Sequence, residues 1–459
     1  MNQQANPRSS WIVYAFLIAV IACGAAAGIY LSGLWPTRAA SDAQIQVGPA
    51  THTHRFPLSE RDAKDTVEAP ELAVDAAGHV YLTWASKTGA AERTIFFTRS
   101  LDGGRTFETP RAVGNGGVFR SGGKGTREGH ERRAMPRIAL AGQQVHVTWS
   151  QADADGSRIR LMLTTSSDGG ATFAEARPVS KADVANPTFT ALALGARGEI
   201  GCAWLGSLGS QKVFAAVRPA KSTDFEADRL IHAGQDSKGV CPCCAVAACF
   251  AEDGTLYVGF RNLTDGYRDI AVGVLKPGKN EVEGPFPVTP PTWKFDGCPH
   301  DGPSLAVIGD TLHVVWMDAR TGAQRCYHAS AKRAEMKFST ANELRAIPAG
   351  TQGNAKLHVE GAGRLHAVWE ESSIAPPADA KHQHGAPTLG KGGRAIYHAV
   401  LGPDGRFEKA KAVAPSDGAF QSRPCVGIAP DGRINIAWNE LTEAGKAVVV
   451  RIQERETSR

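Results

Sequence analysis

One unit recurs along the chain and constrains its fold more than any other feature. Its second β-rich run ends on an aromatic residue, which the successive copies place at Trp84, Trp149, Trp204, Phe260, Trp316, Trp369 and Trp438. The intervals between these aromatics are 65, 55, 56, 56, 53 and 69 residues, and a glycine-containing turn precedes each of them. A period of this length, made of short β-rich runs between turns, is typical of the four-stranded blades of a β-propeller.

The most complete copy runs from residue 136 to residue 173 and contains three β-rich runs separated by turns, with a fourth run following it. Seven copies predict an all-β propeller of seven four-stranded blades over residues 67–459, and six blades plus a divergent module is the alternative. The last copy ends without a fourth strand of its own. We therefore expect a ring-closing strand from the linker, residues 36–66, where 44–47 is an alternating run.

Two copies close with the same octet, Ser-x-Asp-x-Gly-x-Thr-Phe. It is formed by Ser100, Asp102, Gly104, Thr106 and Phe107, and again by Ser166, Asp168, Gly170, Thr172 and Phe173. Ser and Asp side chains accept turn N–H groups, and Gly allows a positive φ. The octet resembles the Asp-box of the sialidase superfamily. This resemblance covers roughly residues 66–454 and implies a propeller in which the motif is structural.

The start of the first blade departs from the sialidase pattern. Sialidases begin it with Arg-Ile-Pro, whose arginine helps to hold the substrate carboxylate, whereas this chain has Glu68 two residues before Pro70. An acid there would repel a carboxylate. A glycoside hydrolase of exo-sialidase type is therefore kept as an alternative function. The candidate catalytic residues are Glu68, Tyr267, Asp269, Asp301 and Asp318.

Residues 11–35 contain no charged side chain and are long enough to span a bilayer. They predict an uncleaved signal anchor that leaves residues 1–10 in the cytoplasm and the bulk of the protein in the periplasm or at the cell surface. The alternative is a lipoprotein, because Val20-Ile-Ala-Cys23 resembles a lipobox. The net charge of +5 is modest for this length and gives no reason to expect a nucleic-acid partner.

The starts of the first strands and the loops after the second-strand aromatics are expected to share one face of the ring. Arginines and other polar residues gather in these segments, and arginine binds carboxylate or phosphate with two parallel donors. We therefore expect a small-molecule or glycan ligand, anionic or carbohydrate, on this face. The candidate ligand-binding residues are His130, Arg133, Arg261, Arg268, Trp293, Arg320 and Arg423.

Cysteines cluster on the same predicted face, and two interpretations of them stay open. The first is disulfide bonding, for example between Cys241 and Cys298, which suits an oxidising compartment. The second is a copper or zinc site, because thiolate and imidazole ligands suit both metals. The candidate metal ligands are Cys241, Cys243, Cys244, Cys298 and His300.

Overall fold

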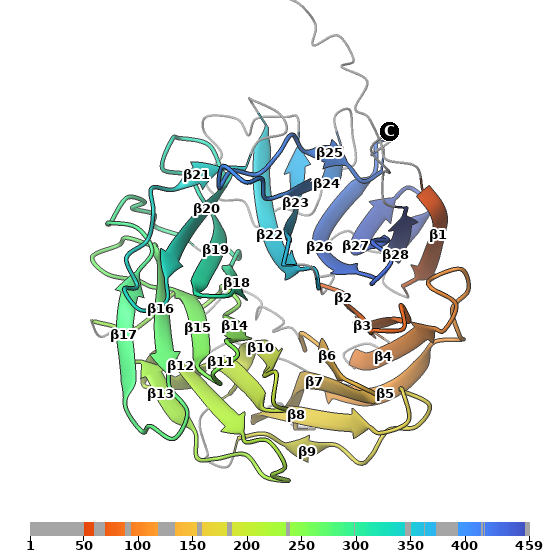
Figure 1. Ribbon diagram of the computed structural model, residues 1–459, viewed down its shortest axis with the longest axis horizontal. Coiled ribbons are helices and arrows are strands. Elements are labelled where there is room, and N and C mark those ends of the chain that lie inside the picture. Colours follow the sequence, from red (N-terminus) through yellow and green to blue (C-terminus); the bar gives the residue numbers. More distant parts are fainter. Residues whose placement is uncertain are drawn as a thin grey trace, which may run out of the picture. The chain divides into compact units, whose positions relative to one another are not determined.

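The computed structural model describes residues 50–58, 69–87, 93–117, 134–153, 158–180, 186–235, 239–297, 299–344, 350–361, 363–372, 393–414, 416 and 418–454. All of these fall in one compact unit, Gln46–Arg459. Every regular element in the described part is a β-strand, and the sheets follow one another around a ring (Figure 1). The predicted all-β propeller of four-stranded sheets is confirmed.

Five of the sheets contain four antiparallel strands in sequence order. The first contains β2 (Glu71–Val74), β3 (Val80–Lys87), β4 (Arg93–Ser100) and β5 (Arg111–Gly117). The second contains β6 (Arg137–Ala141), β7 (Gln144–Ala152), β8 (Ile159–Ser166) and β9 (Arg177–Pro178). The third contains β10 (Thr188–Leu194), β11 (Ile200–Leu208), β12 (Ser210–Arg218) and β13 (Arg229–His232). The fourth contains β14 (Ala247–Phe250), β15 (Leu256–Arg261), β16 (Ile270–Leu275) and β17 (Val282–Pro287). The fifth contains β18 (Ser304–Ile308), β19 (Thr311–Asp318), β20 (Arg325–Lys332) and β21 (Asn342–Glu343).

The remaining eight strands are assigned to one sheet that consists of two four-stranded groups. One group contains β22 (Thr351–Val359), β23 (Leu365–Ser372), β24 (Arg394–Val400) and β25 (Lys411–Ala412). The other contains β26 (Phe420–Ile428), β27 (Ile434–Thr442), β28 (Gly445–Gln453) and β1 (Ala50–Pro57). Among the described residues, the parallel pair Arg394 and Phe420 is the one strand pairing that joins the two groups.

Strand β1 comes from the start of the described chain and pairs antiparallel with β28 along its length. It therefore supplies the outer strand that the last repeat lacks. The run at residues 44–47, which the sequence suggested for this role, lies outside the described residues.

The repeated aromatics lie between successive sheets, and all seven are at most 3% exposed. Each packs against the sheet that precedes it in the ring. Trp149 on β7, for example, lies in one cluster with Ile95 and Phe97 of β4. Trp84 on β3 packs with Val448 of β28, so the same contact closes the ring. Because each sheet packs between two neighbouring sheets, the second strands are buried on both faces.

The two Ser-x-Asp-x-Gly-x-Thr-Phe octets form the same corner. Asp168 accepts hydrogen bonds from the Thr172 amide and hydroxyl at 2.8 and 2.6 Å. These bonds hold the pKa of Asp168 well below its usual range. Gly170 has a φ of +82°, and an added Cβ would lie 2.6 Å from Cζ of Phe97, so the turn approaches the neighbouring sheet too closely for a side chain.

No helix among the described residues is long and apolar enough to cross a membrane. The predicted anchor, residues 11–35, and Cys23 lie outside the part of the chain that the structure describes.

Candidate functional site

A recess opens where the first strands of the sheets begin, and residues in or just before each of these strands line it. Its empty volume is about 520 Å³ with open solvent included. The lining residues are Ala69, Pro70, Glu71, Met135, Arg137, Phe189, Cys243, Ala245, His300, Gly302, Asn354, Lys356, Arg423 and Pro424.

The lining is built from strained backbone. Five of the nine described non-glycine residues with positive φ line this recess: Met135, Phe189, His300, Asn354 and Arg423. Three of these positions coincide with register shifts at the starts of β10, β22 and β26. A β-bulge re-aims side chains, and each left-handed residue costs about 1–3 kcal/mol that the surrounding structure must offset. Such concentration of strain is typical of binding sites.

Buried carboxylates hold two of these left-handed residues in place. The amide of Asn354 donates to Oδ2 of Asp301 at 2.6 Å, and the amide of Arg423 donates to Oε2 of Glu370 at 2.6 Å. Burial raises the pKa of Asp301, and its Oδ1 is buried and accepts no hydrogen bond from a described residue. Asp301, a candidate acid from the sequence, thus supports the wall of the recess through β22.

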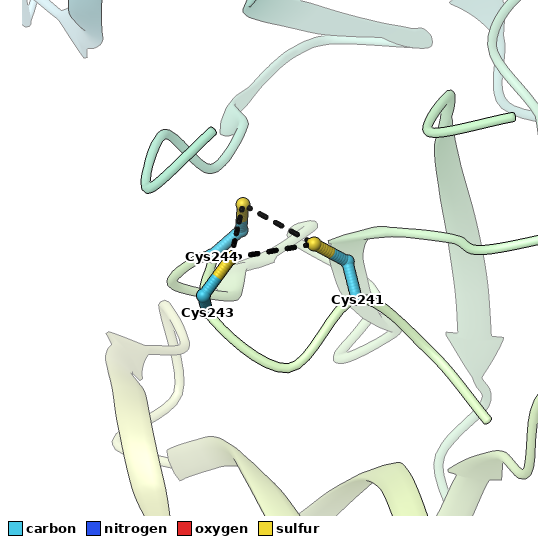
Figure 2. A group of neighbouring side chains, drawn as sticks. All are labelled: Cys241, Cys243 and Cys244. Atoms are coloured by element: carbon cyan, nitrogen blue, oxygen red, sulfur yellow. Dashed lines mark hydrogen bonds between the residues drawn. The ribbon is translucent and has the colours of Figure 1, made fainter. Parts of the chain in front are cut away.

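Three cysteines on the segment before β14 form a compact thiol cluster (Figure 2). The Sγ atom of Cys241 lies 3.6 Å from those of Cys243 and Cys244, which are 3.9 Å apart. All three side chains are buried. Cys243 also lines the recess, so the cluster lies directly behind the recess wall.

The thiol cluster is held by bonds to neighbouring strands. The amide of Cys241 donates to the carbonyl of Arg261 on β15 at 3.2 Å. The amide of Val246 donates to the carbonyl of Phe189 on β10 at 3.0 Å. Gly239, with a φ of +78°, pairs with Gln211 so closely that an added Cβ would lie 2.0 Å from the Gln211 carbonyl oxygen. These contacts fix the position of the main chain that carries the three sulfur atoms.

Positive charge surrounds the cluster. Arg268 donates from Nη1 to Sγ of Cys241 at 3.0 Å. Hydrogen bonds from Cys243 and Cys244, together with the charges of Arg261 and Arg268, lower the pKa of Cys241. Burial raises the pKa of Cys244. The site thus stabilises negative charge on sulfur at Cys241.

The expected disulfides are not found in the described part of the chain. Seven cysteines there carry free thiols: Cys202, Cys241, Cys243, Cys244, Cys249, Cys326 and Cys425. Cys298, the suggested partner of Cys241, lies outside the described residues. His300 lines the recess together with Cys243, but it is not part of the compact thiol group.

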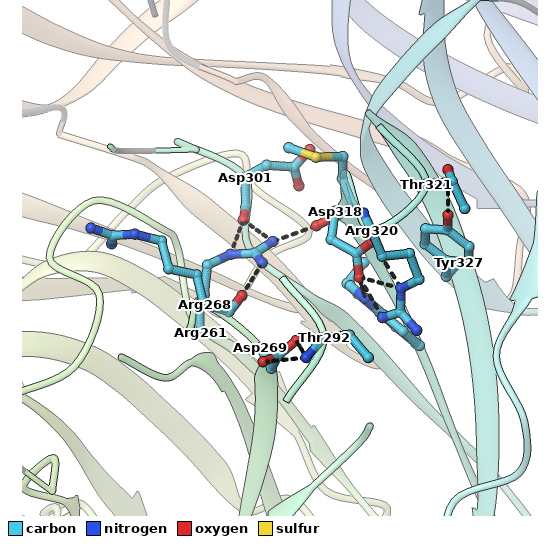
Figure 3. A network of polar contacts seen from close by, with 11 residues as sticks. Arg261, Arg268, Asp269, Thr292, Asp301, Asp318, Arg320, Thr321 and Tyr327 are labelled. Carbon is cyan, nitrogen blue, oxygen red and sulfur yellow. Dashed lines mark hydrogen bonds and ion pairs between the residues drawn. The ribbon is translucent and has the colours of Figure 1, made fainter. Parts of the chain in front are cut away.

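Arg261, a candidate ligand-binding residue, is 1% exposed and donates only to main-chain carbonyls (Figure 3). Its Nε and Nη2 reach the carbonyl of Asp301 at 3.1 and 2.9 Å. Its Nη1 reaches the carbonyl of Arg268, and Nη2 that of Met317, both at 2.7 Å. These contacts give Arg261 a structural role, because every nitrogen of the guanidinium is engaged. Its ligand-binding role stays a prediction that this geometry disfavours.

Asp318 and Arg320 pair with each other and with the core (Figure 3). Asp318 also accepts from the indole Nε1 of Trp316 at 2.8 Å. The same bond recurs from Trp369 to Glu371, at 2.9 Å. The repeated Trp-x-acid spacing was thus a signal, visible in the sequence, that the acid belongs to the architecture.

The other candidates near this network are also engaged. Asp269 accepts from the Thr292 hydroxyl at 2.9 Å, and burial raises its pKa. Trp293 is buried and stacks on Phe295 at 4.9 Å. Tyr267 lies under the ammonium of Lys294, which is 5.6 Å from the ring centre.

Of the remaining sequence candidates, Arg423 lines the recess, whereas Glu68, His130 and Arg133 lie outside the described residues. The sequence did not single out Lys356 or Met135. A partial signal existed for Met135, because a proline follows it just as one follows Arg423, and a residue before proline marks a break in regular structure.

No protein-family model matches this chain, and no curated protein matches it. Solved structures to which it is similar include a NanB sialidase from Streptococcus pneumoniae, at 10% identity and a TM-score of 0.44, with 90% of this chain and 72% of that chain covered. A sialidase from Trypanosoma rangeli is similar at 11% identity and a TM-score of 0.45, with coverage of 88% and 60%. A protein of unknown function from Dyadobacter fermentans is similar at 11% identity and a TM-score of 0.47, with coverage of 89% and 99%. At such low similarity, the function is argued from this chain's own residues.

Proposed function

We propose that this protein binds a thiophilic metal ion, copper(I) or zinc, through Cys241, Cys243 and Cys244. The observation that carries the proposal is the mutual spacing of the three buried sulfur atoms, 3.6, 3.6 and 3.9 Å. Zinc–thiolate bonds of about 2.3 Å in a tetrahedron put the sulfur atoms about 3.8 Å apart. A disulfide needs about 2.05 Å. The cluster therefore suits a shared metal ion better than a bridge.

The surroundings of the cluster support this proposal. Three thiolates around copper(I) or zinc leave net negative charge, and the donor from Arg268 to Cys241 offsets it. Hydrogen bonds to ligand sulfur atoms orient them and tune the metal. Cys243 reaches the recess, which offers an approach for the ion and a side for a fourth ligand.

Metal analysis of the purified full-length protein tests the proposal. We expect about one equivalent of copper or zinc, and we expect Cys243→Ala and Cys244→Ala to lose it. Cys202→Ala is the matched control, because Cys202 is an equally buried free thiol of another sheet. Metal-free protein that takes up neither ion, or equal uptake by Cys243→Ala and Cys202→Ala, would refute the assignment.

The hydrolase alternative has less support. Asp318 is bound to Trp316 and Arg320, and Asp269 is bound to Thr292. We expect Asp318→Asn to lower stability without removing a glycosidase activity. Turnover of a chromogenic sialoside that disappears in this variant, with its fold intact, would restore the alternative.

The proposal includes a propeller of seven blades and an N-terminal anchor. Two four-stranded groups within the eight-stranded sheet support the seventh blade, and the uncharged segment at residues 11–35 supports the anchor. Outside the cytoplasm, neighbouring thiols oxidise to disulfides unless a metal ion binds them. The proposed metal site is therefore compatible with the proposed location outside the cytoplasm. Fractionation of cells that express the full chain and a form lacking residues 1–39 tests the anchor.

A further inference from the structure

Two cationic side chains line the recess beside the thiol cluster. Arg137 stands at the start of β6 and Lys356 stands on β22, and both line the recess together with Arg423. Glu71 is the only carboxylate among the described residues that line the recess. Three cations against one carboxylate leave the described lining with net positive charge.

Lys356 on β22 is partly buried, and its ammonium makes no hydrogen bond or ion pair with any described residue. Burial lowers the pKa of Lys356 and the charge of Arg137 lowers it further, whereas the carboxylates of Glu71 and Asp301 raise it.

Arg137 offers a complementary donor. Its Nη1 pairs with Oε2 of Glu71 at 3.1 Å, and its Nε donates to the carbonyl of Thr190 at 3.0 Å. These bonds fix the plane of the guanidinium, while Nη2 donates to no described residue. A fixed guanidinium with a spare donor is prepared to bind an oxygen of an anion at little entropic cost.

We propose that the recess binds a small oxyanion, a phosphate, sulfate or carboxylate group, between Lys356 and Arg137. Such a group supplies acceptors for the Lys356 ammonium and for Nη2 of Arg137. The left-handed residues around the recess keep its shape without the ligand. The inference is independent of the metal, because both residues stand on strands other than the cysteine segment.

Thermal unfolding of the full-length protein, with and without anion, tests the inference. Inorganic phosphate and sulfate are the free-anion probes, and glucuronate represents a carboxylate carried by a larger ligand. We expect saturable stabilisation of the wild type by at least one probe. Lys356→Met should weaken binding between roughly tenfold and hundredfold, the effect of losing a charged hydrogen bond. Lys276→Met is the matched control, because that lysine is half exposed and pairs with Glu283.

The same variant separates a binding role from a merely structural one. Without anion, Lys356→Met should melt at about the same temperature as the wild type, because the lost ammonium makes no hydrogen bond or ion pair with a described residue. In saturating anion the wild type should melt at the higher temperature. No saturable stabilisation by any of the three probes, or equal affinity in Lys356→Met and the wild type, would overturn the proposal. A preference for glucuronate over both inorganic anions would support it and would assign the group to a larger ligand.

Discussion

Replacement of Arg261 by methionine should destabilise the propeller strongly, because this guanidinium joins three segments of main chain. It makes four hydrogen bonds of 2.7–3.1 Å to the carbonyls of Asp301, Arg268 and Met317. Methionine retains much of the volume but leaves three buried acceptors unpaired. Each unpaired acceptor costs about 1–3 kcal/mol, and non-additivity within one network reduces the sum. We therefore expect a loss of about 3–5 kcal/mol in the free energy of unfolding.

Urea unfolding, followed by tryptophan fluorescence, measures this loss. The midpoint should fall while the dependence on urea concentration stays unchanged, since the surface exposed on unfolding is the same. Arg105→Met is the control, because that arginine is exposed and its replacement should change stability by less than about 0.5 kcal/mol. A loss below about 1 kcal/mol for Arg261→Met, combined with weaker anion binding, would refute the structural role.

Two further predictions concern the architecture. Gly170→Ala should destabilise by more than Gly142→Ala, because both have positive φ but only an added Cβ at Gly170 meets a ring, at 2.6 Å; equal unfolding free energies for the two variants would contradict this. His313 and His328 are buried and share a hydrogen bond of 3.1 Å, and burial lowers the pKa of each, to about 4 and about 3. Since the unfolded pKa is about 6.5, their contribution is complete above that pH and falls as the pH approaches 4, by up to about 2 kcal/mol per histidine at pH 5. His328→Phe should flatten the dependence of the urea midpoint on pH, and parallel curves for the variant and the wild type would exclude the pair as the cause.

The candidate site was predicted only in part. Cys241, Cys243 and Cys244 are close together in the sequence. A tight turn alone can therefore bring their sulfur atoms to the spacing expected for ligands of one metal ion. Arg261 and Asp318 were suggested as ligand-face residues because of their loop positions. Arg261 donates instead to a carbonyl 40 residues away, and Asp318 accepts from the indole of Trp316, which the repeat places in the core. Both side chains therefore bind to the interior of the protein rather than to a ligand.

The sequence by itself determined the architecture of this protein. Seven aromatic repeats and two Asp-box octets are local patterns, and the period of a blade follows directly from strand and turn lengths. Only the tertiary structure decided which side chains meet at the recess. Lys356 and Arg137 come from different sheets, and Cys243 comes from the segment before β14. Left-handed residues and β-bulges set the direction in which the lining side chains point. These choices depend on contacts between distant segments, which no local pattern of the sequence encodes.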